Sequence, residues 1–456
     1  MEVMGMRSAI VLAAGKGTRM KSSLNKVMHP VSNKPMIGHI VTNLRKAGVD
    51  QIVVVVGHGA ESVKSYLGDR VQYALQEPQL GTGHAVMQAK CLKDVQGDTL
   101  VLNGDGPCIQ SETIEAAFAA NADSEMTVVT AVLPDGERYG RIVRDAAGNV
   151  DRIVEAKDCT KEQLEIREIN TGIFCFKNQL LFENLQEIGN DNAQNEYYLT
   201  DLVEIFNRKG MRVKAMVVKD PEETMGVNDR IDLARAQKWM TRHECERHMR
   251  NGVTIIDPDT TYIGVDVEIG QDTVIYPNVI IQGETKIGAN VTILSNSFLR
   301  NATIADEVTI DSSKIVESSV GAKTTIGPMS HLRNHTAIAE NCRIGNFVEF
   351  KNSTFGTGSK CAHLTYVGDA DVGSGVNFGC GVVTVNYDGK NKYRTTIKDG
   401  AFIGSNVNLI APVTVGENAL LAAGSTITDD VEDGDMGIAR SRQQIKAGYG
   451  TKYKNK

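Results

Sequence analysis

The stretch IGVDVEIGQDTVIYPNVII (residues 263–281) places an isoleucine at every sixth position, at Ile263, Ile269, Ile275 and Ile281. An α-helix repeats every 3.6 residues and an ordinary strand every two, so neither explains this spacing. A six-residue period is typical of a parallel β-helix, in which three hexads form one triangular coil and the periodic aliphatic side chains stack inside it. The stretch therefore predicts a left-handed parallel β-helix, a hexapeptide-repeat domain.

The same period extends far beyond this stretch. It continues to Phe378 with occasional five-residue steps, breaks at TVNYDGKNKYRTT (384–396), and resumes from Ile397 to Ile427. We therefore expect a polar loop that projects from an otherwise regular prism. The last residues, Arg440 to Lys456, carry six Lys or Arg and no acid, which by itself fits a solvated end better than a binding arm.

The first half of the chain follows another pattern, in which short apolar runs alternate with helix-like stretches. The runs AIVLAA (9–14) and IVVVV (52–56) are continuous, as in strands that are buried on both faces of a sheet. A mostly parallel sheet with helices on both faces is expected. The segments GKGTR, GHG and NGDGP follow these strands, at the carboxyl ends where such sheets bind ligands.

A charged, helix-like stretch, RIDLARAQKWMTRHECERHMR, separates the two halves. The sequence thus predicts an α/β, Rossmann-like domain at 1–229, a linker helix at 230–250, and a β-helix domain with a basic tail at 251–456. The length of 456 residues agrees with two or more domains.

The composition of the chain argues against several classes of protein. Lys and Arg number 49 against 56 Asp and Glu, a formal charge of −7, so no general affinity for nucleic acid is implied. No apolar run reaches the roughly 18 residues of a membrane span, and the N-terminus does not resemble a cleavable signal. The eight cysteines form no CxxC pair, which fits reduced thiols in a cytosol better than a zinc site or disulfides.

The segment LAAGKGTRMKSSLNK (12–26) is a candidate phosphate-binding loop. Glycines after a strand let backbone N–H groups close around phosphate oxygens, and Arg19 and Lys26 can neutralise the negative charge. Neither GxGxxG nor GxxxxGK[ST] is complete here, because Met20 stands where the third glycine would be. From this segment alone, a plain strand-to-helix turn stays an alternative.

Several further motifs decide between these alternatives. QLGTGHAV (79–86), NGDGP (103–107), YGRIV (139–143), IVEAKD (153–158), EINTGIF (168–174) and GVND (226–229) follow in order. Together with LxxGxGTRM, Lys26 and Pro30, they resemble the signature of sugar-nucleotide pyrophosphorylases. Joined to the hexad region, nearly the whole chain is similar to the bifunctional family of N-acetylglucosamine-1-phosphate uridyltransferase and glucosamine-1-phosphate N-acetyltransferase.

For the first half, the resemblance implies transfer of UMP from UTP to N-acetylglucosamine 1-phosphate with release of pyrophosphate, assisted by Mg²⁺. Asp105 and Asn228 take the positions of the metal ligands, and Arg19 and Lys26 take catalytic positions on the triphosphate. The residues implied in binding UTP or the UDP-sugar are Leu12, Ala13, Ala14, Gly15, Lys26, Gln76, Gly81, Thr82, Gly140, Glu155, Asn170 and Asn228.

This chain departs from the family at Gly106, because the motif GDxP usually has a β-branched residue between Asp and Pro. A glycine loosens the backbone beside the presumed metal ligand Asp105. Taken singly, Asp105 also suits ordinary turn chemistry, and Glu155 and Asn170 suit solvated or capping positions. Only their order within the set of motifs favours the functional interpretation.

In the hexad region, HLTYVGDADVG (363–373) comes shortly before the expected loop, and Asn386 and Tyr387 lie at the root of that loop. Imidazole titrates near neutrality, so His363 suits the base that removes a proton from an attacking amine. Asn386 and nearby backbone N–H groups can hold the oxyanion or the acceptor. Without this context, a histidine in a β-helix would more often be surface or stack filler.

The resemblance supplies the remaining residues of this second site. It implies that glucosamine 1-phosphate contacts Arg333, Lys351, Tyr366 and Asn377. It implies that acetyl-CoA contacts Cys380, Asn386, Tyr387, Ser405, Ala423 and Arg440. No acyl-cysteine is expected at Cys380. The basic tail suits the anionic coenzyme, and the family implies a homotrimer with sites between prisms.

The sequence therefore favours a cytoplasmic, bifunctional transferase of peptidoglycan and lipopolysaccharide precursor supply, with no nucleic-acid or membrane partner. A second hypothesis is a nucleotidyltransferase whose hexad region only assembles subunits. A third is a non-catalytic sensor of nucleotide sugars. His363 and Asn386 favour acetyl transfer over the second hypothesis, and the completeness of both sites disfavours the third.

Overall fold

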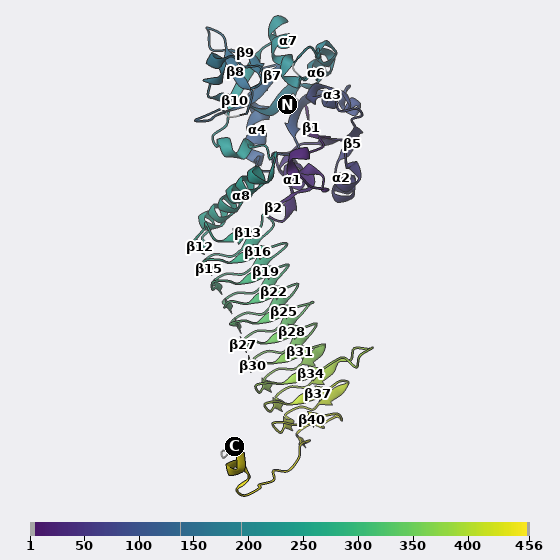
Figure 1. Cartoon of the computed structure of the whole chain (residues 1–456), viewed down its shortest axis with the longest axis vertical. Coiled ribbons are helices and arrows are strands. Elements are labelled where there is room, and N and C mark those ends of the chain that lie inside the picture. The colour runs from purple at the N-terminus through teal and green to yellow at the C-terminus, as the bar shows by residue number, and fades with distance from the viewer. Residues whose placement is uncertain (1–4, 137, 193, 454–456) are drawn as a thin grey trace. The chain divides into compact units, whose positions relative to one another are not determined.

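A computed structural model describes residues 5–136, 138–192 and 194–453 (Figure 1). The chain divides into two compact units, Met1–Met240 and Thr241–Lys456. The division falls inside helix α8 (Arg230–Arg250), whose bounds coincide with the expected linker helix.

The first unit is built on a mostly parallel sheet with strand order β11-β7-β10-β6-β1-β4-β5, in which β10 is antiparallel to both its neighbours, and the antiparallel pair β8–β9 joins it through a pairing of β8 with β10. Its strands are β1 (Met6–Ala13), β2 (Pro30–Val31), β3 (Lys34–Pro35), β4 (Gln51–Val56), β5 (Gln72–Leu75), β6 (Gly97–Asn103), β7 (Met126–Val132), β8 (Arg141–Arg144), β9 (Val150–Val154), β10 (Glu168–Lys177) and β11 (Val213–Val217). The helices before α8 are α1 (Met36–Lys46), α2 (Ala60–Leu67), α3 (Thr82–Met87), α4 (Ser111–Ala120), α5 (Lys161–Leu164), α6 (Asn178–Asn184) and α7 (Leu202–Arg208). Short 3-10 helices are η1 (Thr18–Met20), η2 (Lys26–Met28), η3 (Gly68–Arg70), η4 (Lys90–Leu92), η5 (Leu185–Glu187), η6 (Leu199–Asp201) and η7 (Pro221–Thr224).

Alternate residues of the central strands enter two different cores. In β1, Val11 packs into the core that contains α1, α2 and α4, whereas Ile10 packs into the core that contains α3, α6 and α7. A strand that must be apolar on both faces reads as a continuous Val/Ile/Leu run, because successive side chains point to opposite faces. The predicted α/β architecture is thus confirmed, and the loops after β1, β4 and β6 meet at one edge of the sheet.

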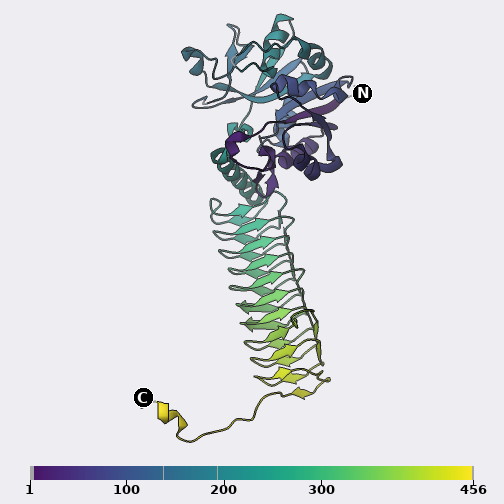
Figure 2. The same cartoon turned by 45° about the vertical axis from the view of Figure 1, so that its right-hand side comes forward.

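The second unit is a left-handed parallel β-helix, whose short strands form three long parallel sheets within the described residues (Figure 2). The first face comprises β12 (Thr254–Ile255), β15 (Val274–Ile275), β18 (Thr292–Ile293), β21 (Thr309–Ile310), β24 (Thr325–Ile326), β27 (Arg343–Asn346), β30 (Lys360–His363), β33 (Asn377–Phe378), β36 (Phe402–Ile403), β39 (Leu420–Leu421) and β41 (Met436–Gly437). The second face comprises β13 (Tyr262–Ile263), β16 (Ile280–Gln282), β19 (Phe298–Arg300), β22 (Lys314–Val316), β25 (His331–Arg333), β28 (Glu349–Lys351), β31 (Tyr366–Gly368), β34 (Val383–Val385), β37 (Asn408–Ile410) and β40 (Thr426–Ile427). The third face comprises β14 (Glu268–Ile269), β17 (Lys286–Ile287), β20 (Thr303–Ile304), β23 (Ser319–Val320), β26 (Ala337–Ile338), β29 (Thr354–Phe355), β32 (Ala370–Val372), β35 (Thr395–Ile397) and β38 (Val413–Val415).

The periodic aliphatic residues form the interior of this prism. Ile275, Ile293, Ile310 and Ile326 are in-register partners on successive coils, and all are nearly or fully buried. Identical positions therefore stack directly on one another, and each coil buries its inward side chain against the next. The six-residue period predicted this core correctly.

Between strands, the chain turns through left-handed backbone conformations. Asn290, Glu307, Lys323 and Asn341 all have positive φ at one corner, and each donates its N–H to a carbonyl of the preceding coil. Asparagine and glycine are common at such corners because they tolerate positive φ at the smallest cost. The corners are thus held by backbone hydrogen bonds, which leaves their side chains available for other contacts.

The predicted loop projects from the stack between β34 and β35 (Figure 1). It is braced at its base by a bridge between Tyr387 and Lys392 and by a hydrogen bond from the Tyr393 N–H to the Asn386 carbonyl (2.9 Å). Beyond the prism, the tail carries a short 3-10 helix, η8 (Tyr449–Tyr453). Among the helices of the described residues, none is both long and apolar enough to cross a membrane.

Candidate active sites

The glycine-rich segment after β1 makes a sharp turn at Gly17. This residue has a φ of 59°, and a Cβ there would lie 2.6 Å from the Lys26 Cβ. Glycine is therefore required for Lys26 to pack directly behind the loop. Asn25 fixes the same region, because its side chain accepts from the Val27 N–H (3.0 Å) and donates to the His58 carbonyl (2.6 Å).

Two cations and two oxygen-bearing side chains converge beside this loop. Lys26 Nζ forms an ion pair with Asp105, just beyond β6, and donates to Asn228 Oδ1 (3.1 Å), just before α8. Arg19 Nη2 donates to the same Asn228 oxygen (2.8 Å). Residues more than 200 positions apart thus form one charged centre, and their side chains come from three different segments.

The two oxygen-bearing residues at this centre fit a magnesium ion. Asp105 and Asn228 present hard carboxylate and amide oxygens, which already share one cation, the Lys26 ammonium. Their segments are fixed to each other, because the Val227 N–H donates to the Asp105 carbonyl (2.9 Å) and the Asn228 N–H to Asp232 Oδ2 (2.9 Å). The described residues hold no group of three or more His, Cys, Asp or Glu that could bind a metal, so Mg²⁺ here would keep waters or phosphate oxygens.

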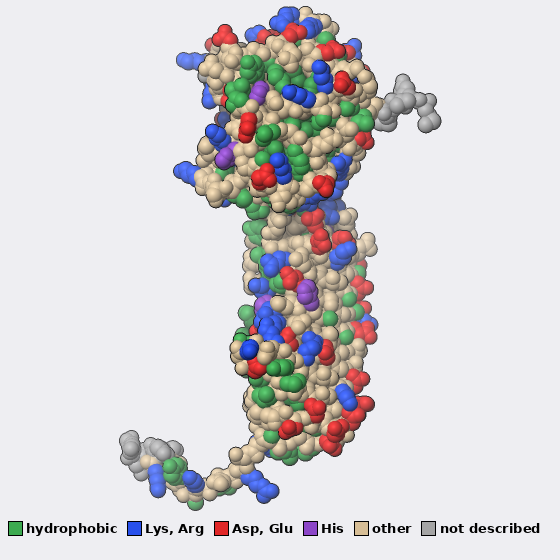
Figure 3. Space-filling view, turned by 90° about the vertical axis from the view of Figure 1, so that its right-hand side faces the viewer, with side chains coloured by type: hydrophobic (Ala, Val, Ile, Leu, Met, Phe, Trp, Pro, Cys, Tyr) green, Lys and Arg blue, Asp and Glu red, His purple; other side chains and the backbone are tan. Residues whose placement is uncertain are grey.

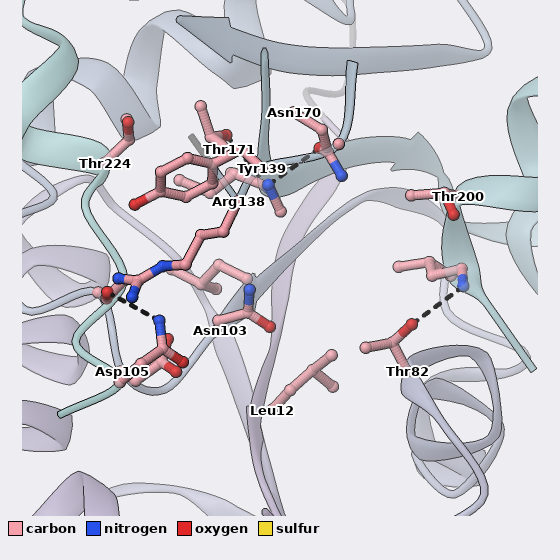
Figure 4. A pocket seen from close by; sticks show the side chains of 18 of the residues that line it. Leu12, Thr82, Asn103, Asp105, Arg138, Tyr139, Asn170, Thr171, Thr200 and Thr224 are labelled. Atoms are coloured by element: carbon pink, nitrogen blue, oxygen red, sulfur yellow. Dashed lines mark hydrogen bonds between the residues drawn. The ribbon is translucent and has the colours of Figure 1, made fainter. Parts of the chain in front are cut away.

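Two cavities of about 730 and 260 Å³ open beside the charged centre and share Leu12, Thr82, Asn103 and Asp105 in their walls. Figure 4 shows Asp105 and Tyr139 on one side of the larger cavity and Thr82 and Thr200 on the other. The walls of the two cavities include all of the site residues that the sequence indicated in the first unit, namely Leu12, Ala13, Ala14, Gly15, Arg19, Lys26, Gln76, Gly81, Thr82, Asp105, Gly140, Glu155, Asn170 and Asn228.

The smaller cavity has a polar end formed by the segment after β5. The buried Gln76 donates its amide to the Gly81 carbonyl (3.0 Å), which leaves its Oε1 as the accepting atom. Thr82 starts α3 and accepts from the Leu199 N–H (3.0 Å). This arrangement can form hydrogen bonds with the edge of a nucleobase through Gln76 Oε1 and the backbone of Gly81.

The larger cavity has a polar wall at a bulge in β10. Asn170 donates its N–H to the Gly140 carbonyl (2.8 Å), and its Oδ1 accepts from the Gly172 N–H (2.9 Å). Burial raises the pKa of the Glu155 carboxyl, and the nearby charges of Asp158 and Asp201 raise it further. This wall can hold several hydroxyl groups, as a sugar requires.

The structure also reveals lining residues that the sequence analysis missed. Arg138 lines the larger cavity and pairs through Nη2 with the buried Asp232 (2.5 Å), next to the Asn228 turn. Asn103 and Thr200 line it as well. Arg138 directly precedes the YGRIV motif and Asn103 opens NGDGP, so adjacency to these motifs was the available signal.

In the prism, the predicted acetyl-transfer residues lie at two edges of the second face. His363 ends β30 at the edge with the first face and is exposed, and it is the in-register partner of Asn346. Cys380, Ser405 and Ala423 occupy the equivalent corner of later coils, because the N–H groups of Asn406 and Gly424 donate to the Cys380 and Ser405 carbonyls (both 2.8 Å). Arg440 reaches this column by donating to the Ala423 carbonyl (2.7 Å).

The opposite edge of the second face holds the predicted phosphate-binding cations. Arg333 and Lys351 are in-register partners on successive coils. Arg333 pairs with Glu349 (2.6 Å), and Lys351 pairs with Asp369 (3.0 Å). Asn386 lies at the same edge, at the root of the projecting loop, with Tyr387 exposed beside it. Figure 3 shows Lys, Arg and His side chains gathered on the prism beside this loop.

The remaining two acceptor residues lie elsewhere on the prism. Tyr366 lies in β31, on the second face between its two edges, and is the in-register partner of Glu349. Asn377 starts β33 on the first face. One prism thus presents the predicted base and the predicted phosphate-binding cations at separate edges.

The fold and these two centres define a class: a nucleotidyl transferase joined to a hexapeptide-repeat transferase. The nucleotidyl transferase family matches residues 8–240, the GMPPB C-terminal domain matches 257–354, and the bacterial transferase hexapeptide family matches 394–429.

Comparison with relatives over nearly the whole chain identifies its family more specifically. It is 54% identical to the bifunctional protein GlmU of Exiguobacterium sibiricum, over 97% of this chain and 99% of the relative. The bifunctional proteins GlmU of a Geobacillus species (54%, over 97% of both chains) and of Halalkalibacterium halodurans (52%, over 99% of this chain and 100% of the relative) are similarly close. The chain belongs to the bifunctional GlmU family and is a bifunctional transferase.

Gly106, where the family usually has a larger residue, is not required by the backbone. It is absent from the residues with positive φ, and the nearest atom to an added Cβ is the Met225 carbonyl oxygen at 3.9 Å. We therefore expect Gly106→Ala to keep uridylyl transfer within about threefold of the wild type, since no contact is strained.

Gly81→Ala is the matched contrast. Gly81 has a φ of 105°, and an added Cβ would lie 2.7 Å from the Tyr197 carbonyl oxygen. The KM of this variant for UTP should rise about tenfold or more, because the turn that the sequence predicts to bind the nucleobase must shift. Pyrophosphate release at varied UTP measures both variants, and equal effects would show that Gly106 is also a constrained position.

Asp201, beside the larger cavity, gives the stability a pH dependence. Burial, with a smaller contribution from Glu204, raises its pKa from 3.8 to about 6. Between these values the folded state binds more protons than the unfolded state, so this carboxyl makes stability fall as pH rises. Asp201→Asn should therefore gain about 1 kcal/mol over the wild type at pH 8 and little at pH 4.

Urea unfolding at the two pH values measures this difference. A gain for Asp201→Asn that is the same at both pH values would contradict the assignment.

Proposed function

We propose that the chain makes UDP-N-acetylglucosamine from glucosamine 1-phosphate in two steps at two separate sites. The prism acetylates the amine with acetyl-CoA, and the nucleotidyltransferase domain then couples the product to UMP from UTP. Residues 1–229 and 251–456 are the proposed functional domains, with α8 as the linker. The proposed setting is the cytoplasm, where the product serves as a precursor of the cell envelope.

In the uridylyl transfer, a phosphate oxygen of N-acetylglucosamine 1-phosphate attacks the α-phosphorus of UTP, and the bond to pyrophosphate breaks. Positioning and charge neutralisation carry most of this catalysis. Arg19 and Lys26 hold the triphosphate, Gln76 accepts from the uracil imide through Oε1, and Glu155 and Asn170 hold the sugar hydroxyls. When bound by Asp105 and Asn228, Mg²⁺ supplies positive charge that offsets the charge of the phosphates.

In the acetyl transfer, the amine of glucosamine 1-phosphate attacks the thioester carbon. An amide bond forms, the C–S bond breaks, and the coenzyme leaves as a thiolate that takes up a proton. His363 removes the proton from the amine. Arg333 and Lys351 bind the phosphate of the acceptor. Asn386 donates its amide to Asp369, so its Oδ1 is the atom that can accept from the amine.

A homotrimer completes the second site. The base and the coenzyme column lie at one edge of the second face, and the acceptor cations lie at the other. Packing of three prisms allows the base edge of one subunit to face the acceptor edge of the next. The family supports this assembly, in which the exposed His363 would face a neighbouring subunit.

The observation that carries the proposal is that one chain holds two separate charged centres, one formed by Arg19, Lys26, Asp105 and Asn228 at the sheet edge and one by Arg333 and Lys351 on the prism. A prism that only assembles subunits would need no exposed histidine aligned with a column of small residues. A nucleotide-sugar sensor would need no paired cations at the acceptor edge.

Reciprocal variants test the two-site proposal. His363→Ala should lower kcat for acetyl transfer by about 10²- to 10⁴-fold, because the general base is lost, and leave uridylyl transfer unchanged. Asp105→Asn should lower uridylyl transfer at least about 100-fold, because a metal-binding charge is lost, and leave acetyl transfer unchanged.

Each half-reaction serves as the control for the other. Release of free coenzyme A measures the first, and pyrophosphate release measures the second. Unchanged acetyl-CoA consumption by His363→Ala would favour the assembly-only hypothesis. No turnover of UTP by the wild type with N-acetylglucosamine 1-phosphate and magnesium would favour the sensor.

A further inference from the structure

A buried carboxylate lies at the acceptor edge of the prism, outside the set of residues assigned above. Asp369 forms the left-handed corner between β31 and β32, with a φ of 48°. Asn301, Glu317 and Asn352 occupy the same corner on earlier coils, and each of the four donates its N–H to the preceding coil. For Asp369 this bond goes to the Lys351 carbonyl (2.9 Å).

The Asp369 side chain receives three donors. Its Oδ2 accepts from Lys351 Nζ (3.0 Å) and from Asn386 Nδ2, and its Oδ1 accepts from Asn352 Nδ2 (2.6 Å). The side chain is only 7% exposed, and that of Lys351 is 12% exposed. One carboxylate oxygen thus joins a predicted phosphate-binding lysine to the residue at the root of the projecting loop.

The corner itself does not require a carboxylate. Asparagine serves at the same corner at Asn301 and Asn352, with the same backbone conformation and the same kind of backbone bond. Burying a negative charge costs free energy unless it is paired and hydrogen-bonded. Burial acts to raise the pKa of Asp369, but the donors Asn352, Lys351 and Asn386 hold it below the ordinary value. Because asparagine suffices for the backbone at this corner, the negative charge of Asp369 serves to hold the side chains of Lys351 and Asn386.

We infer that Asp369 is a positioning residue of the acetyl-transfer site, which fixes the Lys351 ammonium and the Asn386 amide relative to each other for the acceptor. The inference rests on the proposed function of the prism. Lys351 has a flexible stem of four methylenes, and a fixed partner removes most of its freedom before the phosphate arrives. Asn386 donates its Nδ2 to the same carboxylate oxygen, and this orientation leaves its Oδ1 to accept a hydrogen bond from the acceptor.

Asp369→Asn removes the charge at a corner that already accommodates asparagine elsewhere. The KM for glucosamine 1-phosphate should rise about tenfold or more, since charge-assisted hydrogen bonds to the two acceptor residues are lost. The rate of uridylyl transfer should stay within about twofold of the wild type.

Asp371→Asn is the matched control. Asp371 lies two residues further along, is about half exposed (48%), and pairs with Arg394 (2.5 Å) instead of an acceptor residue. Its kinetic constants should stay within about twofold of the wild type.

A cycle with Lys351→Ala separates positioning from a merely structural role. If Asp369 acts through Lys351, Asp369→Asn should change the KM by less than about threefold once Lys351 is alanine. A structural role would lower the thermal midpoint and the active fraction, and would change the KM equally in both backgrounds. If Asp369→Asn does not fold, Asp369→Glu keeps the charge but moves the oxygens by about one methylene, and the same rise in KM is expected.

An unchanged KM for glucosamine 1-phosphate, or equal effects in the two Lys351 backgrounds, would overturn the inference while the wild type still acetylates. A wild type that does not acetylate glucosamine 1-phosphate would instead remove the proposed function, and the inference with it.

Discussion

The constraint on which the prism depends is the in-register stacking of one inward aliphatic side chain per hexad. Because Ile293, Ile310 and Ile326 must lie directly above one another, every outward residue is also fixed relative to its neighbours on adjacent coils. Arg333 therefore lies beside Lys351 although 18 positions separate them in the sequence. The apolar core thus determines the spacing of Arg333 and Lys351, the cations proposed to bind the acceptor.

In the first unit, a parallel sheet in place of stacked coils brings the charged side chains together. Parallel strands deliver their carboxyl ends to one edge, where the loops after β1 and β6 meet the segment before α8. Lys26, Asp105 and Asn228 come together there through a glycine that permits close approach and through backbone bonds between the segments. In both units, the apolar core fixes the strands. The strands in turn fix the positions of the charged side chains at or beyond their ends.

The sequence predicted the architecture well because both patterns, continuous apolar runs and a six-residue period, report directly on burial. It also indicated the residues of the first site, since each stands in a short motif after a strand. It missed Arg138 and Asp369, which pair with Asp232 and Lys351. Arg138 stands beside a motif, but the neighbouring residues in the sequence indicate neither pairing. Nor could the period alone show that His363 and Lys351 lie at different edges of one face.

If the register of the stack positions the residues proposed for acetyl transfer, a crystal structure of the assembled protein with glucosamine 1-phosphate and coenzyme A should show it. We expect the sugar phosphate within about 3 Å of the Arg333 and Lys351 side chains, and the coenzyme along the column of Cys380, Ser405 and Ala423, with its thiol near a His363 side chain. A coenzyme bound away from that column, or a phosphate that contacts neither cation, would contradict this expectation.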